Sequence, residues 1–422
     1  MNSKKDAPSK EQATLRQRMS ILAVCLALQS IGAGALFTVF ARKIGALDQG
    51  TEVFGLSATL FSLAALVSAP YMGLLADQCG KRRLLLGSLA AHALACLATL
   101  WAPTGAAFVA VRVAAGALTA GLVPASMGMV GDLTSQSTRG RWVGFVTGWS
   151  GIGFIVGPPL GGWVYDRWGL AAPFLVATAA HAIAFLVALV FVPGKTTRTT
   201  QLQQGHIKAA PETARRLARL NPWALIPPPY HAWVVLGAIS FIAVFAWRFV
   251  EPQFHFFIYD TLGWTSARFG LAMSGYALLM VFAQTVLGSL SDRFGRRSVL
   301  ILGLVVHTAQ YVALIATRSP SWIALGIAGS GLGEGLFMPA LNATYLDLAP
   351  EQGRSRAIGF KECMFSLGGL AGPALVIVAT RYLQPAIIFI IGGALILGSA
   401  LLVPFLSWNN SSRRAIQALT SK

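Results

Sequence analysis

The chain has 422 residues, of which 55% are hydrophobic and only 11% are charged, yet its formal net charge is +18. Soluble domains carry about 25% charged residues, so this composition excludes an ordinary soluble protein. It also argues against a nucleic-acid-binding protein, which would gather its basic residues on a polar face. The four cysteines are scattered and show neither a disulfide framework nor a zinc-binding spacing. The composition favours a membrane protein whose few charges lie outside the lipid.

Twelve apolar stretches are each long enough to cross a bilayer, which takes roughly 20 residues. The first six run over residues 20–40, 53–76, 84–101, 105–131, 142–165 and 171–192. The second six run over residues 232–259, 267–290, 299–317, 322–346, 357–380 and 386–408. No small-residue cleavage site follows the first stretch, so we interpret it as a retained span rather than a signal peptide. We therefore expect an all-α membrane protein with twelve transmembrane helices.

The stretches predict two six-helix bundles, residues 20–192 and 232–408, with tails at 1–19 and 409–422. The polar, basic linker between them, residues 193–231, is expected to hold a short amphipathic helix at 212–220. Of the 33 Lys and Arg residues, 24 fall on the side that holds both tails and the linker. Because basic residues favour the cytoplasmic face, we expect both termini in the cytoplasm and the chain in the cell inner (plasma) membrane.

An internal repeat relates the two bundles at a constant offset of 215 residues: His92 falls on His307, and Asp132 falls on Asp347. Matches between apolar residues arise easily by chance, whereas matched His and Asp residues in one register do not. A parallel repeat of six helices is typical of secondary transporters that bind substrate between the halves, near the bilayer midplane.

A loop rich in glycine and charge occurs once in each half, after the second and the eighth span. Both copies contain the frame Gly-x-x-x-Asp-x-x-Gly followed by basic residues: Gly73, Asp77, Gly80, Lys81 and Arg82, then Gly288, Asp292, Gly295, Arg296 and Arg297. Gly80 supplies a turn with positive φ, and Asp77 can accept hydrogen bonds at a nearby helix end. A short positive loop on the cytoplasmic face would explain the basic residues but not the repeated frame.

The doubled loop resembles the signature of the major facilitator superfamily, and the resemblance covers all twelve spans. It implies a transporter in which this loop is a cytoplasmic latch that breaks and reforms as the bundles rock. The fifth span carries a second motif, which is similar to one of the twelve-span drug/proton antiporters at the interface of helices 5 and 11: Gly153, Gly157, Pro158, Gly161 and Gly162. Ordinary helix packing would explain the glycines but not Gly-Pro followed by Gly-Gly.

Ionisable residues inside the spans are candidates for coupling and substrate binding, because a charge in lipid costs on the order of 3 kcal/mol. Glu334 lies about 12 residues, roughly 18 Å, into the tenth span. Burial favours a neutral carboxyl and a nearby cation favours a charged one, so Glu334 can hold either a proton or a cationic substrate. Our candidates for these roles are Glu334, Arg112, Glu251, Arg248 and Gln29.

Some of these residues have a second interpretation. Arg112 resembles the buried arginine of a superfamily motif, but it can also extend to the membrane surface. Arg248 and Glu251 stand three apart on one helix, so they either neutralise each other or bind substrate. Gln29 stands where several proton-coupled relatives carry an acid, which moves proton carriage to Glu334 and then to Glu251.

Lys361 and Glu362 lie near the cytoplasmic end of the eleventh span. A position at the membrane surface, an ion pair to the 132–141 loop and substrate contact explain them equally well. Several aromatic and polar residues are candidates for lining an apolar cavity, although packing roles also fit: Phe241, Phe245, Tyr276, Gln284, Asn342 and Tyr345. His92, His181 and His307 are predicted to be buried histidines with satisfied hydrogen bonds.

No nucleotide-binding glycine loop, metal-ligand cluster or nucleophile–base arrangement stands out, so we expect no enzyme, no metal and no cofactor. A proton gradient would then supply the energy, since one charge crossing 100 mV is worth about 2.3 kcal/mol. The leading hypothesis is a monomeric, proton-coupled exporter of amphipathic drug-like small molecules, with protons and the lipid bilayer as partners and no nucleic acid. The alternatives are transport of a small metabolite, such as a sugar, organic acid or peptide, and a non-transporting receptor or sensor.

Overall fold

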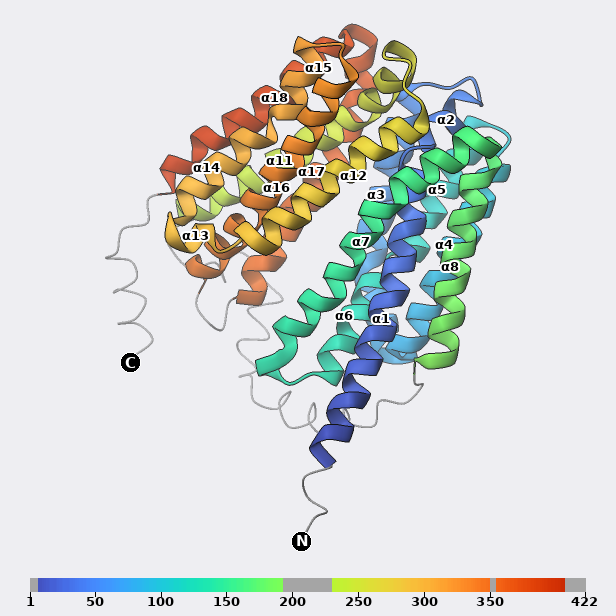
Figure 1. Ribbon diagram of the computed structural model, residues 1–422, viewed down its shortest axis with the longest axis vertical. Coiled ribbons are helices and arrows are strands. Elements are labelled where there is room, and N and C mark those ends of the chain that lie inside the picture. The colour runs from blue at the N-terminus through green and yellow to red at the C-terminus, as the bar shows by residue number, and fades with distance from the viewer. Residues whose placement is uncertain (1–6, 193–229, 350–353, 407–422) are drawn as a thin grey trace. The chain divides into compact units, whose positions relative to one another are not determined.

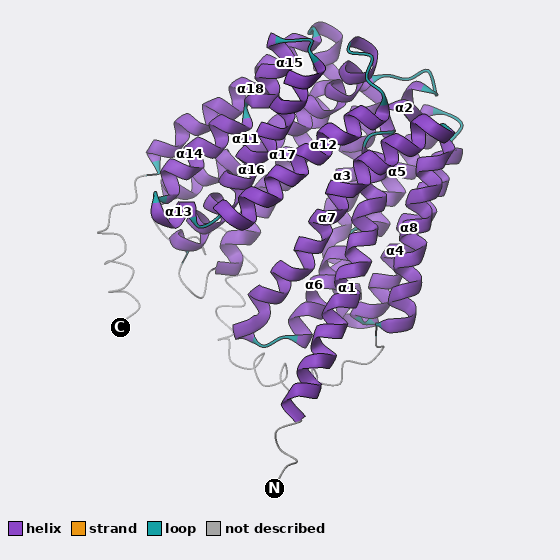
Figure 2. Cartoon of the chain, viewed as in Figure 1, coloured by secondary structure: helices purple, strands orange, loops and turns teal. Residues whose placement is uncertain are grey.

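The computed structural model describes residues 7–192, 230–349 and 354–406, and all regular elements there are helices (Figures 1 and 2). The side chains of residues 7–12, 77, 136–137 and 354–356 lie outside this description. Twelve helical stretches are long and apolar enough to cross a membrane, which confirms the predicted all-α fold with twelve spans. The predicted linker and its amphipathic helix, and the predicted C-terminal tail, fall almost entirely or entirely outside the described residues.

The first six spans comprise eight helices. They are α1 (Ala7–Phe37), α2 (Phe40–Gly45), α3 (Thr51–Cys79), α4 (Lys81–Trp101), α5 (Gly105–Thr119), α6 (Leu122–Leu133), α7 (Gln136–Trp168) and α8 (Ala171–Phe191). The helix α1 begins ahead of the predicted start at Ser20, because the polar residues before the apolar run continue the same helix. The fourth span consists of α5 and α6, which are separated at Ala120 and Gly121.

The last six spans are interrupted more often. They comprise α11 (Tyr230–Phe256), a π-helical turn (Phe257–Thr261), α12 (Ser266–Phe282), a second π-helical turn (Ala283–Leu287), α14 (Arg296–His307), α15 (Ala309–Ala316), α16 (Pro320–Leu348), α17 (Arg354–Tyr382), α18 (Pro385–Leu402) and a 3-10 turn (Val403–Phe405). A short helix, α13 (Leu290–Arg293), precedes α14. Proline begins α16 and α18, where its missing N–H costs no intrahelical hydrogen bond.

The chain forms two compact units. The first unit contains α1 to α8 together with Pro252–Ala277, which is the end of α11 and most of α12. The second unit contains the rest of the described residues from Tyr230 onward. Pro252 removes a backbone hydrogen bond of α11 where the division crosses that helix. The π-helical turn that begins at Ala283 follows closely on the division within α12.

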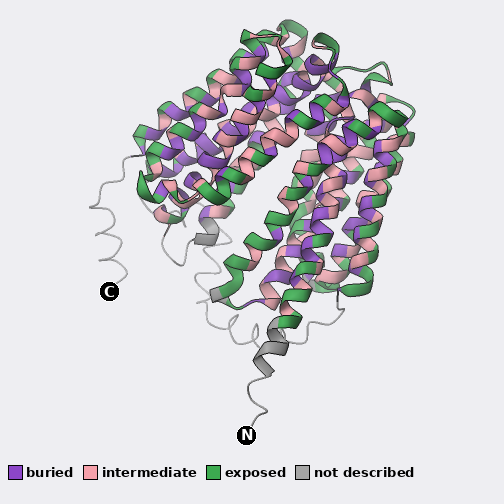
Figure 3. Cartoon of the chain, in the orientation of Figure 1, coloured by how far each residue is buried: buried purple, intermediate pink, exposed green. Residues whose placement is uncertain are grey.

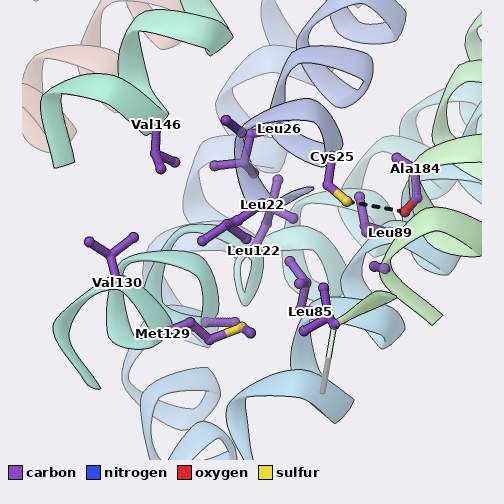
Figure 4. Close-up of a cluster of buried hydrophobic side chains, with 14 of the residues drawn as sticks. Leu22, Cys25, Leu26, Leu85, Leu89, Leu122, Met129, Val130, Val146 and Ala184 are labelled. Atoms are coloured by element: carbon purple, nitrogen blue, oxygen red, sulfur yellow. Dashed lines mark hydrogen bonds between the residues drawn. The ribbon is translucent and has the colours of Figure 1, made fainter. Parts of the chain in front are cut away.

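Aliphatic side chains fill the core of the first unit between α1, α4, α6, α7 and α8 (Figure 4). Leu22 and Leu85 are 2% and 0% exposed, and Cys25 donates to the Ala184 carbonyl oxygen at 3.6 Å. Figure 3 marks exposed residues along the helices. Many of them are large and apolar: Leu94 is 66% exposed and Val190 is 69% exposed. Such a surface is unfavourable in water and favourable in lipid, which fits the predicted spans.

Glycines of α7 bring its backbone close to that of α1. A Cβ added at Gly153 or Gly157 would lie 2.8 Å from Ile31 N or 2.7 Å from Ile31 O, and one at Gly161 would overlap the Ala35 carbonyl oxygen. Because these glycines repeat every four residues, they lie on one face of α7. Small residues at this spacing are the usual means by which membrane helices pack tightly.

The second unit uses the same device at the equivalent positions. A Cβ added at Gly368 of α17 would lie 2.6 Å from Phe241 O, and one at Gly372 would lie 2.7 Å from Phe249 N, both on α11. These glycines follow Gly153 and Gly157 at the 215-residue offset. The contact of α17 with α11 therefore repeats the contact of α7 with α1.

The short helix α2 is tied to the end of α4 by a lysine. Lys43 is 6% exposed, and its Nζ donates to the carbonyl oxygens of Leu100 and Ala102 at 2.9 and 3.0 Å. These carbonyls belong to the C-terminal end of α4, where a cation is favoured by the helix dipole. Burial lowers the pKa of the Lys43 amine.

Candidate functional site

Glu334 occupies the midpoint of α16, with 14 residues of that helix on either side. Its neighbours in sequence are glycines that bring other helices close. A Cβ at Gly333 would lie 2.6 Å from Gly303 O of α14, and one at Gly335 would lie 2.6 Å from Ala283 Cβ. Glu334 itself is partly buried, and among the described residues no hydrogen bond or ion pair reaches its carboxyl group. A carboxyl group placed in this way is free to take up a proton or a cation.

Arg248 and Glu251 form the ion pair that their spacing on α11 suggests. Arg248 Nη1 lies 2.8 Å from Glu251 Oε2, and the Glu251 side chain is 7% exposed. The Arg248 side chain is 42% exposed, so the guanidinium group is the accessible end of the pair. Gly372 of α17 packs against Arg248: a Cβ added at this glycine would lie 2.9 Å from the Cβ of Arg248. Mutual neutralisation, one of the two interpretations of this pair, is present.

Lys361 of α17 is buried and bound to α16. Its Nζ donates to Asn342 Oδ1 at 2.8 Å, pairs with Glu362 Oε1 at 2.9 Å and lies 4.9 Å from the centre of the Phe365 ring. Lys361 is 6% exposed and Glu362 is exposed. The structure therefore joins the candidate cavity residue Asn342 to a buried cation, a link that the sequence does not predict.

Arg112 of α5 lies between two aromatic rings of the first unit. Its guanidinium carbon is 4.7 Å from the centre of the Phe40 ring and 4.3 Å from that of Phe61. The faces of aromatic rings attract a cation electrostatically. Gln29 of α1, the candidate that replaces an acid, is partly buried and accepts from the hydroxyl of Ser30 at 3.4 Å.

The remaining candidate cavity residues fall into different environments. Phe241 and Phe245 stack at 5.5 Å along α11, and the stack continues to Phe249 at 5.9 Å. Tyr345 is fully buried, and its hydroxyl lies 2.9 Å from that of Ser240. Tyr276 is partly buried and Gln284 is exposed, and these two lie in different units: Tyr276 in the first, Gln284 in the second.

His181 and His307 are buried as predicted, whereas His92 is only partly buried. His92 and His307 each have Nδ1 next to a carbonyl oxygen, that of Ser88 at 2.8 Å and that of Ser330 at 3.0 Å. His181 stacks on His92 with 5.1 Å between ring centres, and its Nδ1 lies close to Ala177 O. Its Nε2 is buried without a hydrogen-bond partner among the described residues.

The two glycine-rich loops, residues 73–82 and 288–297, make equivalent contacts. Gly80 and Gly295 both have positive φ, 90° and 86°, where a side chain would be strained. Lys81 Nζ pairs with Asp132 at 2.7 Å, and Arg296 Nε pairs with Asp347 at 3.2 Å. The following arginines bind the ends of the last helix in each half: Arg82 donates to Val192 O at 2.6 Å, and Arg297 donates to Leu406 O.

Of the two aspartates in the repeated loop frame, the structure describes the side chain of only one. Asp292 pairs with Arg296 at 2.6 Å, four residues further along the chain, whereas the side chain of Asp77 lies outside the described residues. The two glycines that begin the frame also differ. A Cβ added at Gly288 would lie 2.6 Å from the carbonyl oxygen of Gln284, whereas nothing lies within 4 Å of a Cβ added at Gly73.

The Lys81–Asp132 pair can be tested by a double-mutant cycle. The two side chains are 22% and 16% exposed, so water screens them only in part. We expect Lys81→Met and Asp132→Asn each to lower the free energy of unfolding, and the double variant to lose less than their sum by about 1–2 kcal/mol. Chemical unfolding in detergent measures this difference. Strict additivity of the two losses would show that the pair contributes no stability.

Within the first unit, the glycine–proline motif of α7 packs against two helices, α1 and α12. Gly153, Gly157 and Gly161 face α1, while an added Cβ at Gly162 would overlap Ser266 O, at the start of α12. Close by, Asp166 of α7 accepts from two backbone N–H groups of α12. Asp166 was not among the predicted residues, because a lone acid beyond the motif, near the end of a span, carries no pattern of its own.

Several known proteins resemble this chain in sequence, and solved structures resemble it in fold. The chain matches the model of the Major Facilitator Superfamily over residues 19–256 and 236–422. The class G tetracycline resistance protein of Vibrio anguillarum is 27% identical over 366 residues, which cover 85% of this chain and 89% of that protein. A homolog of the multi-drug resistance efflux pump PmrA from Lactococcus lactis is 23% identical, over 79% of this chain and 80% of the pump.

Among solved structures, a bacterial homolog of the human lysosomal transporter Spinster has the same fold, with a TM-score of 0.70. It is 14% identical, and the match covers 94% of this chain and 99% of the homolog. The family model, the twelve spans and the doubled loop make this chain a member of the Major Facilitator Superfamily, and hence a multi-pass membrane transporter of small molecules rather than an enzyme.

Proposed function

We propose that this transporter exports amphipathic, drug-like small molecules in exchange for protons. The observation that carries the proposal is Glu334, an acid at the midpoint of a spanning helix that no described residue neutralises. The tetracycline and multi-drug resistance proteins among its relatives add support for export, at 23–27% identity. The Gly-Pro motif of α7 supports the same direction of transport.

The mechanism follows from competition for one carboxylate. When Glu334 is ionised it binds a cationic substrate, and when it is protonated it releases that substrate. Alternating access of two six-span halves, residues 20–192 and 232–408, would expose Glu334 to each side of the membrane in turn. Glu251, the second candidate acid, forms an ion pair with Arg248 and is therefore a weaker candidate for carrying the proton. Gln29 cannot carry a proton, so α1 contributes only hydrogen bonds.

We further propose that both termini are cytoplasmic, that the membrane is the cell inner membrane and that the protein works as a monomer. The charge distribution supports the orientation, because 24 of the 33 basic residues fall on one side of the twelve spans. Four of these basic residues fix the two glycine-rich loops to neighbouring helices: Lys81, Arg82, Arg296 and Arg297.

Inverted membrane vesicles test the proposal directly. A panel of toxic amphipathic compounds first identifies those to which expression confers resistance. Adding such a compound to energised vesicles should then release protons from the lumen, detected by a pH-sensitive dye, and vesicles without the protein should show no release. Resistance without any proton movement would rule out proton exchange, and the lack of resistance to every compound would argue against export.

The second candidate function, uptake of a small organic acid, rests on a different observation. Lys361 and Arg112 are cations within spans, and Lys361 is held by Asn342 in a buried position. Cations so placed can bind a carboxylate substrate. Accumulation of a labelled organic acid by whole cells that express the protein, abolished by Lys361→Met, would favour uptake over export.

A further inference from the structure

Asp166 attaches the last turn of α7 to the first turn of α12. Its Oδ1 accepts from the backbone N–H of Ser266 at 3.1 Å, and its Oδ2 accepts from that of Ala267 at 2.8 Å. These are the first two residues of α12, whose N–H groups have no partners within the helix. A carboxylate is the strongest acceptor for such groups, because it also interacts favourably with the positive end of the helix dipole. Asp166 therefore caps a helix that lies about a hundred residues further along the chain.

Below this cap, α7 and α12 meet along a row of small residues. A Cβ added at Gly270 would overlap Pro158 O, and the hydroxyl of Ser274 donates to Ile155 O. Ser274 bonds there to a carbonyl in the Gly-Pro region of α7, where proline leaves carbonyls without intrahelical partners. We call this contact, formed by Asp166, Gly162, Gly270 and Ser274, the α7–α12 seam.

The segment Pro252–Ala277, which contains the start of α12, also makes polar contacts with α1 and α2. Arg42 Nη2 donates to Trp264 O at 3.1 Å, and its guanidinium carbon lies 3.8 Å from the centre of the Tyr259 ring. His255 Nε2 lies 3.1 Å from Phe37 O, and Ser266 is 0% exposed. Pro252–Ala277 is thus part of the first unit, although the rest of α11 and α12 belongs to the second.

We propose that Asp166 is the latch residue of this segment: its carboxylate keeps α12 docked on α7, and release of the cap is a step of the transport cycle. The segment is suited to release because Pro252 and a π-helical turn interrupt its helices near both points where it leaves the first unit. Polar cap bonds break and reform more readily than an apolar core, and the residues that meet along the α7–α12 seam are small. The proposal needs only a transporter with moving helices, and it holds whatever the substrate or the coupling ion.

Thiol labelling in the full-length protein tests this latch. Ser266→Cys places a reporter thiol in the buried start of α12, in a chain whose exposed Cys79 and Cys363 are replaced by serine. A membrane-impermeant maleimide should label this thiol slowly, since it reacts only when α12 leaves α7. We expect Asp166→Asn to speed labelling about fivefold, because asparagine keeps one acceptor oxygen but loses the second acceptor and the negative charge. Asp166→Glu keeps the carboxylate and should restore most of the slow rate.

Asp260→Asn is the matched control, because Asp260 is an exposed acid of the same segment. It should leave the labelling rate unchanged. Equal rates for the parent and Asp166→Asn, or an equal increase with Asp260→Asn, would overturn the proposal. Gly270→Ala opens the same seam without removing a charge, so it must also raise the rate. Should Asp166→Asn not reach the membrane, an unchanged rate in Gly270→Ala would count equally against the latch.

Discussion

Replacement of Gly161 by alanine should destabilise the protein by at least about 2 kcal/mol, and replacement by leucine should abolish its accumulation in the membrane. An added Cβ at this position would overlap the Ala35 carbonyl oxygen of α1. A backbone atom cannot move aside as a flexible side chain does, so the whole of α1 would have to shift. Thermal or chemical unfolding in detergent measures the loss.

Gly148, on the same helix, provides the matched control for Gly161. Nothing lies within 4 Å of a Cβ added there, and the residue is exposed. Alanine is the better helix former by up to about 1 kcal/mol, so Gly148→Ala should be neutral or stabilising. If the two alanine variants unfold at the same denaturant concentration, the close packing of α1 and α7 does not limit stability.

The 215-residue repeat carries much of the fold information in this sequence. It places Lys81 with Arg296 and Asp132 with Asp347, and the structure forms an ion pair at each of these equivalent positions. Position 161 breaks the correspondence, since Val376 is its counterpart and is fully buried. The two halves therefore share their loops more closely than their helix packing.

At the candidate site, the sequence does not predict which neighbouring helix each helix face contacts. Glycines at four-residue spacing predict a packing face on α7, but any helix that presents small side chains or bare backbone could pack against it. The partners, α1 and α12, follow only from the fold. The contact of Lys361 with Asn342 has the same origin, because two polar residues on different spans show no spacing that would link them. Arg248 and Glu251 were easier to relate, since three residues on one helix fix their distance.

Glu334→Gln should abolish proton-driven accumulation of substrate while leaving a folded transporter in the membrane. Glutamine keeps the size and polarity of the side chain but neither gains nor loses a proton. A gradient of one pH unit is worth about 1.4 kcal/mol per proton, so one-for-one exchange supports about tenfold accumulation. In the variant this ratio should fall to about one, while exchange of labelled for unlabelled substrate continues at high substrate concentration, where the lost carboxylate limits binding less. Uptake by inverted vesicles at an imposed pH gradient measures both quantities.

Glu52→Gln makes the same chemical change at an exposed acid in the first turn of α3, so it should retain the full ratio. Glu334→Asp keeps the titrating group on a shorter side chain, so it should keep coupling at a lower rate. Accumulation by Glu334→Gln at the level of the unmodified protein would move coupling elsewhere. The remaining buried acid, Glu251, would then have to exchange its Arg248 partner for a proton in each cycle. Such an exchange gives up the ion pair of a buried carboxylate, whereas protonation of Glu334 gives up none, which is why we propose Glu334 for the coupling role.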